Sequence, residues 1–167
     1  MFKWEFDQVE DFKFASIETG SECLWILHAD KIPPHIGISK GASYFSLKVD
    51  GKDEALELTV LKKLIAAKKI PTLVVSLKVG LDEHKIAKQF GLYTTASANK
   101  CTCLTPIKSV LNELEVSKLN QLLAALNSAG KIQSVHGLYL PQDYQGIPEY
   151  TEQDIHTHLN QLKGEPA

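Results

Sequence analysis

The sequence predicts an α+β domain in which helices pack against an antiparallel sheet, and three observations lead to this class. Short apolar runs of strand length occur in pairs separated by turn residues. Amphipathic helical stretches follow them without regular alternation of strand and helix. A chain of 167 residues with 44% hydrophobic and 23% charged residues is typical of one compact domain, so we expect a single domain over residues 1–167.

The first predicted elements are three strands. Residues 23–29 (CLWILHA) form an apolar run of strand length, which also places Cys23 in the core. Residues 34–39 and 43–49 are two further strand-like segments. The turn residues Lys40, Gly41 and Ala42 separate these two segments, so the pair is expected to form a hairpin.

A helix and a strand are predicted next. Apolar residues recur at helical spacing within residues 54–70, and Pro71 ends the pattern. The expected buried positions are Leu58, Leu61, Leu64 and Ile65. Residues 72–79 (TLVVSLKV) are rich in β-branched side chains, which predicts a strand directly after the helix.

The middle of the chain contains a predicted helix and loop. Residues 82–90 begin with acidic side chains and are followed by Gly91, as expected of a capped helix. Its buried face should contain Ile86, Ala87 and Phe90. Residues 94–100 are small and polar and predict a loop.

The remaining elements are three helices and a strand. Thr105 and Pro106 resemble a helix N-cap and first turn, with an apolar face formed by Ile107, Val110, Leu111 and Leu114. Further along, we expect a helix at 117–126, a strand at 135–140, a loop at 141–148 and a last helix at 151–162.

Composition disfavours several classes of partner. The net charge is −2, all eighteen basic residues are lysine, and no glycine-rich phosphate-binding motif occurs. We therefore expect no nucleic acid and no nucleotide as partner. The first 14 residues do not resemble a secretory signal, and no apolar run is long enough to cross a membrane. These features predict a cytoplasmic protein without membrane contact, whose cysteines are free thiols.

One histidine and two cysteines are candidates for chemistry. His35 follows a double proline, which restricts the backbone at the start of its strand. Cys101 and Cys103 lie at or just before the start of the helix near residue 105, where backbone N–H groups favour a thiolate. An imidazole and a helix-start thiol form a nucleophile and its base if the fold brings them into hydrogen-bond reach.

The order of these elements resembles a known superfamily. The strand CLWILHA, the hairpin PHIGIS and SYFSLKV, the segment DEHKIAKQFGLY and the helix CTCLTPIKSVL are together similar to the circularly permuted papain-like hydrolases. These comprise the NlpC-type amidases and peptidases of the YiiX kind and the lecithin:retinol acyltransferase-like proteins. The resemblance covers about residues 23–114, and leaves residues 117–163 as a C-terminal extension without an assigned role.

The resemblance implies a thiol-dependent hydrolase or acyltransferase acting on an amide or ester. His35 would be the general base and Cys103 the nucleophile, because Ile107 and Val110 follow Cys103 on one helix face; Cys101 is the alternative. The family usually has a further polar residue, often histidine, that orients the base; this strand offers Ser46 or Lys48 at that place, and Ser46 is the candidate. The substrate would be a small molecule or peptide-like, and no cofactor or metal is expected.

Two other functions remain open. Thr102 and Leu104 flank the predicted nucleophile in place of the family's asparagine and acidic residue, and Ser46 replaces the usual histidine. These departures favour a catalytically silent binding or assembly module with the same fold. A zinc site formed by thiol and imidazole ligands is the second alternative, although the spacing matches no recognised zinc motif. Its ligands would be Cys101, Cys103, His28 and His35.

Overall fold

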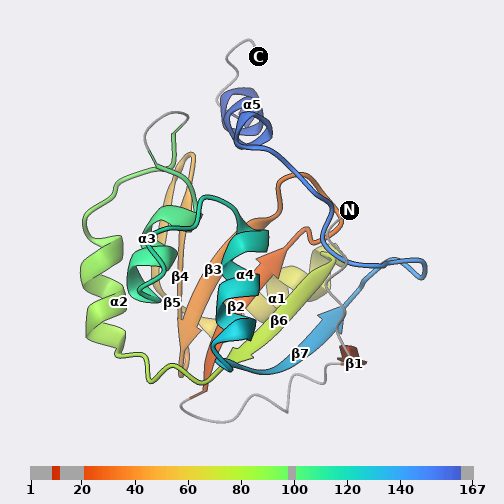
Figure 1. Ribbon diagram of the computed structural model, residues 1–167, viewed down its shortest axis with the longest axis horizontal. Helices are drawn as coiled ribbons and strands as arrows, with labels where there is room; N and C mark the ends of the chain where they lie inside the picture. Colours follow the sequence, from red (N-terminus) through yellow and green to blue (C-terminus); the bar gives the residue numbers. More distant parts are fainter. Residues whose placement is uncertain (1–8, 12–20, 98–100, 163–167) are drawn as a thin grey trace.

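The protein is an α+β fold built on a seven-stranded sheet, as predicted (Figure 1). The computed structural model describes residues 9–11, 21–97 and 101–162. The strands lie in the order β1-β7-β6-β2-β3-β4-β5, and every neighbouring pair is antiparallel except β1 and β7. Their bounds are β1 Val9–Asp11, β2 Glu22–Leu27, β3 His35–Lys40, β4 Ser43–Lys48, β5 Gly51–Glu57, β6 Thr72–Leu77 and β7 Ile132–Leu138.

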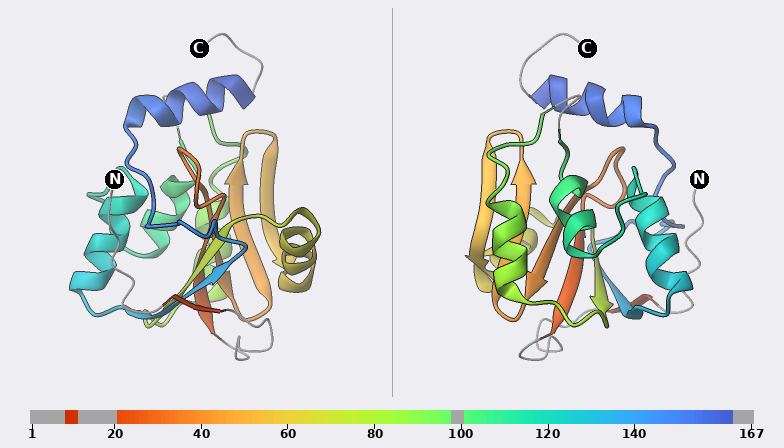
Figure 2. Two further views of the ribbon diagram at one scale, coloured as in Figure 1. Left: turned by 90° about the vertical axis from the view of Figure 1, so that its right-hand side faces the viewer. Right: turned by 60° about the vertical axis from the view of Figure 1, so that its left-hand side comes forward.

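Helices cover the two faces of the sheet unequally (Figure 2). Helix α1 lies on one face, α2, α3 and α4 lie on the other, and α5 lies across one end of the sheet. The bounds are α1 Leu58–Lys68, α2 Glu83–Phe90, α3 Leu104–Val110, α4 Leu119–Ser128 and α5 Glu152–Leu162. Among the described residues, no helix has the length and apolarity needed to span a membrane.

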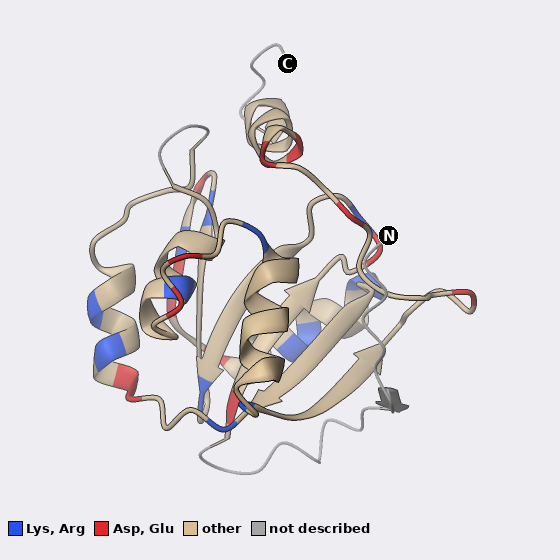
Figure 3. Cartoon of the chain, in the orientation of Figure 1, with Lys and Arg blue, Asp and Glu red and all other residues tan. Residues whose placement is uncertain are grey.

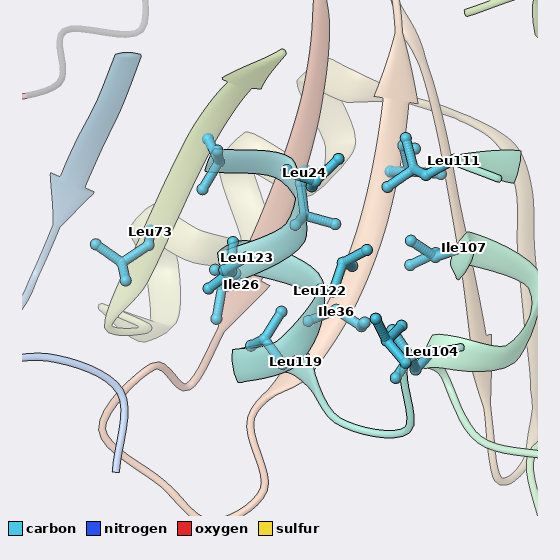
Figure 4. Close-up of a cluster of buried hydrophobic side chains, with 14 of the residues drawn as sticks. Leu24, Ile26, Ile36, Leu73, Leu104, Ile107, Leu111, Leu119, Leu122 and Leu123 are labelled. Atoms are coloured by element: carbon cyan, nitrogen blue, oxygen red, sulfur yellow. The ribbon is translucent and has the colours of Figure 1, made fainter. Parts of the chain in front are cut away.

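Alternation of side chains along the strands separates two hydrophobic layers. Leu24 and Ile26 of β2 pack into the larger layer, whereas Cys23, Trp25 and Leu27 pack into the smaller layer. The larger layer joins the sheet to α2, α3 and α4, and Figure 4 shows its centre. The smaller layer joins the sheet to α1. We call these the α3 layer and the α1 layer.

The C-terminal third of the chain belongs to the same core. The α4 residues Leu119, Leu122, Leu123 and Leu126 are buried in the α3 layer, and β7 pairs with β6 inside the sheet. Charged side chains lie mainly on helices, loops and the outer strand, while the central strands carry few (Figure 3). Residues predicted as an extension therefore contribute directly to the packing of residues 23–114.

The predicted helix at 54–70 is wrong in its first turn, because Gly51–Glu57 forms the outer strand β5. Glu57 has an extended backbone and α1 begins only at Leu58. This strand has no apolar run and contains several charged residues, so the sequence did not predict it. An edge strand faces solvent and can form without an apolar run. Ala55, with φ of 51°, lies where the pairing with β4 is irregular.

Three residues predicted in buried helix faces are exposed instead: Leu64 at 42%, Leu114 at 61%, and Ala87. Leu64 lies beside the α1 stripe of Leu58, Leu61 and Ile65 without contributing to it. Leu114 is outside α3, which ends at Val110. For Leu64 and Ala87 the predicted apolar face was too wide, and for Leu114 the predicted helix was too long.

Candidate functional site

The predicted nucleophile lies at the start of α3 and faces the α3 layer. Cys103 is the N-cap residue of α3 and packs against that layer with Leu104 and Ile107. Burial raises the pKa of its thiol, while hydrogen bonds from the backbone of Ile36, Cys103 and Leu104 act in the opposite direction. The sulfur of Cys103 therefore lies against the backbone of β3, one residue from His35.

The side chain of His35 leaves β3 on the other face. In the ladder between β2 and β3, His35 is opposite Leu27 and Ile36 is opposite Ile26. Leu27 belongs to the α1 layer, whereas Ile36 lies in the α3 layer, where Figure 4 shows it near Leu104. Because opposite residues of a ladder share a face, His35 is directed toward the α1 layer and Cys103 toward the α3 layer.

Two neighbours of His35 support this direction. Burial lowers the pKa of His35 to about 4, with Asp53 acting against that shift and Lys48 adding to it. Tyr44, Ser46 and Lys48 stand two residues apart on β4 and share one face, and Tyr44 is buried in the α1 layer. Asp53 and Lys48, two of the charged groups that act on His35, thus lie on the face of the sheet opposite Cys103.

Ser46 lies on the same face as His35 but has a different partner. It is fully buried, and its hydroxyl donates to Asp53 Oδ2 at 2.8 Å. Lys48 Nζ lies 3.3 Å from Asp53 Oδ1. The bulge in β5 opposite Phe45 precedes this pairing and brings Asp53 level with Ser46. Ser46 therefore orients a carboxylate across the strand pair.

A glycine and a tyrosine close the α1 face next to His35. A Cβ added at Gly37 would lie within 2.2 Å of Tyr44 Oη, so the tyrosine ring occupies the space over this glycine. The Tyr44 hydroxyl is buried without a hydrogen-bond partner in the described part of the chain. Tyr44 therefore fills the space over Gly37, which is two residues from His35 on the same face of β3.

Cys101, the alternative nucleophile, lies in a pocket between α3 and α5. Its sulfur donates to the carbonyl oxygen of Thr95 at 3.2 Å. The pocket has a volume of about 360 Å³ and includes an imidazole, a carboxylate and an ammonium group. Its lining residues are Cys101, Thr102, Leu104, Thr105, Lys108, Ser117, Glu152, Ile155 and His156.

Sequence reasoning missed most of this pocket. Its polar residues come from the segment before α3, from α3 itself, from Ser117 and from the first two turns of α5, and no single motif joins these segments. The face of His35, by contrast, was visible in the alternation of HIGIS: Ile36 and Ile38 are apolar, whereas His35, Gly37 and Ser39 share the other face.

The zinc hypothesis receives no support from the geometry. Within residues 9–11, 21–97 and 101–162, no group of three or more His, Cys, Asp or Glu side chains is arranged to hold a metal ion. Cys23, Cys101 and Cys103 are free thiols.

Comparison with models of known protein families, with curated proteins and with solved structures finds no match to this chain.

Proposed function

We propose that this protein is a catalytically silent binding module with an α+β fold of the permuted papain-like kind. The observation that supports it is the register of β3, which directs His35 and Cys103 toward opposite layers of the sheet. A general base must lie within about 3 Å of the proton that it removes, directly or through one water. Neither partner has the expected chemistry, since burial disfavours both the thiolate of Cys103 and the imidazolium of His35.

The binding site of the proposed module is the pocket between α3 and α5. It has the volume of a small-molecule site, and its lining combines the apolar side chains of Leu104 and Ile155 with hydroxyl, charged and imidazole groups. It lies at the start of the same helix that would carry the nucleophile in the family. The module would thus keep the position of the ancestral cleft while using other side chains.

Thiol labelling with iodoacetamide distinguishes this module from a cysteine hydrolase. The native protein is labelled across a series from about pH 6 to about pH 9, and peptide mass spectrometry measures each cysteine separately. We expect Cys103 to react at least about tenfold more slowly than Cys101 at every pH, because burial raises the pKa of the Cys103 thiol and so disfavours its thiolate. Both should react fully after unfolding.

The variant His35→Gln supplies the second arm, with His84→Gln as the matched control because His84 is an exposed histidine on α2. We expect neither substitution to change the pH dependence of Cys103 labelling. Selective labelling of Cys103 below about pH 7 that is lost in His35→Gln, with the fold retained by circular dichroism, would establish the thiol–imidazole pair and refute the proposal.

A further inference from the structure

The α3 wall of the pocket presents hydroxyl donors. The backbone N–H of Thr102 donates to Thr105 Oγ1 at 2.9 Å, and the N–H of Leu104 donates to Thr102 Oγ1 at 3.2 Å. Each threonine oxygen therefore acts as an acceptor toward the backbone, which leaves its own O–H as a donor. Both threonines line the pocket, so their hydroxyl groups are candidate donors to an acceptor placed there.

Lys108 adds a positive charge to the same wall. Its Nζ donates to the carbonyl oxygen of Val116 at 3.2 Å, which fixes the ammonium group at the pocket. An ammonium group has three donors, so two are left for a ligand. The hydroxyl and the cation of α3, together with the Thr102 hydroxyl just before the helix, match the needs of a carboxylate, whose two oxygens accept several hydrogen bonds.

The opposite wall has a different character. It comes from α5, where Ile155 is 9% exposed and lies across the pocket from the buried Leu104. Glu152 lies in the first turn of the helix and brings a carboxylate to the pocket. Figure 3 shows the acidic start of α5 and the lysine on α3. Glu152 would repel a simple anion and attract an ammonium group.

We propose that the pocket binds a free α-amino acid with a branched apolar side chain, an inference that rests on the proposed binding function. The carboxylate is held by Lys108 with Thr102 and Thr105, the ammonium group by Glu152, and the side chain packs between Leu104 and Ile155. The pocket, at about 360 Å³, accommodates a ligand of this size.

Three probes of the same carbon skeleton test this proposal: L-leucine, 4-methylpentanoate, which lacks the ammonium group, and isopentylamine, which lacks the carboxylate. Each is titrated into the full-length protein and followed by amide chemical shifts. We expect L-leucine to bind at least about tenfold more tightly than either analogue, since each loses one charge-assisted interaction. The shifts should be centred on Thr102, Thr105 and Ile155.

Two pairs of variants assign the charges. Lys108→Met should weaken L-leucine about tenfold or more, whereas Lys88→Met, which removes an exposed lysine from the last turn of α2, should not. Glu152→Gln should weaken L-leucine and leave 4-methylpentanoate unweakened, whereas Glu83→Gln on α2 should change neither.

The proposal is overturned if L-leucine causes no shifts at the pocket, if 4-methylpentanoate binds as tightly as L-leucine, or if Lys108→Met has no effect. None of these results changes the thiol-labelling outcome, which uses no pocket ligand. Failure of the amino-acid assignment is therefore distinguishable from failure of the binding-module proposal.

Discussion

Replacing Gly37 by alanine tests the strand register on which the proposed function depends. A Cβ at this position would lie 2.2 Å from Tyr44 Oη and 2.3 Å from its Cζ. Non-bonded carbon atoms prefer separations of about 3.5 Å, so the Tyr44 ring would have to move by roughly an ångström. The ring is 1% exposed and packed in the α1 layer, so it has no open space to enter.

Overpacking of a buried site costs about 1–3 kcal/mol, and we expect Gly37→Ala to lower the free energy of unfolding by about 3 kcal/mol. The sign is informative, because alanine in a strand is otherwise favoured over glycine by about 0.5–1 kcal/mol. Gly37 is not among the residues with positive φ, so its backbone tolerates a side chain. Only the contact with Tyr44 opposes the substitution.

Urea denaturation followed by tryptophan fluorescence measures this change, with Gly91→Ala as the control. A Cβ at Gly91 would lie 3.2 Å from the carbonyl oxygen of Ala87, and its cost should stay below about 1 kcal/mol. In the double variant Gly37→Ala, Tyr44→Leu, the two effects should be non-additive by about 1 kcal/mol or more, because the residues are in contact.

Unchanged stability of Gly37→Ala would refute the reasoning about the site as well as about packing. A shift of β3 by one residue reverses the face of every side chain along it. Gly37 would then leave the α1 layer, and His35 would be directed toward the layer of Cys103. A harmless alanine at position 37 would therefore reopen the case for the thiol–imidazole pair.

Three further substitutions test other contacts. His35 is held neutral by burial with a pKa of about 4, below its usual 6.5, so the unfolded chain binds the extra proton first. The free energy of unfolding should decrease as the pH is lowered from 6.5 to 4. His35→Gln should make it less dependent on pH in urea titrations. The carboxylate of Glu22 accepts from the N–H groups of Gly80 and Leu81 at 2.9 and 2.7 Å; Glu22→Gln should cost about 2 kcal/mol by chemical denaturation, and no loss would contradict this role. Asp82 caps α2 by accepting from His84 N–H at 2.9 Å, and Asp82→Ala should cost about 1 kcal/mol, whereas a cost near zero would mean that the cap is not formed in solution.

Local signals predicted most of the elements because each helix and strand follows a pattern within a few residues. The cap at Asp82 and the helix end before Pro71 both appear in the structure as the sequence indicates. β5 was not predicted, because strand prediction depends on an apolar pattern that its sequence GKDEALE lacks. Its pairing with β4, which holds it in the sheet, cannot be read from the local sequence.

The candidate site was harder to predict, since it depends on which face of a strand meets which helix. The sequence placed His35 at a strand start and Cys103 at a helix start, and both positions agree with the structure. The two side chains lie on opposite faces of the sheet because α3 packs on the face of Ile36. That packing depends on contacts between residues far apart in the sequence. The pocket of Lys108 and Glu152 likewise depends on where α5 crosses the sheet.

The parallel pairing of β1 with β7 has a consequence for how the chain is made. Val9 pairs with Val135, and β7 also covers the edge of the apolar strand β6. During synthesis on a ribosome, one edge of β6 therefore has unpaired backbone N–H and C=O groups until residues 132–138 have been added. Until then β1 also lacks the strand with which it pairs. Nascent chains stalled before that point expose the unpaired edge of an apolar strand, to which chaperones or other chains can bind. Premature termination should therefore yield aggregates instead of a shorter folded domain.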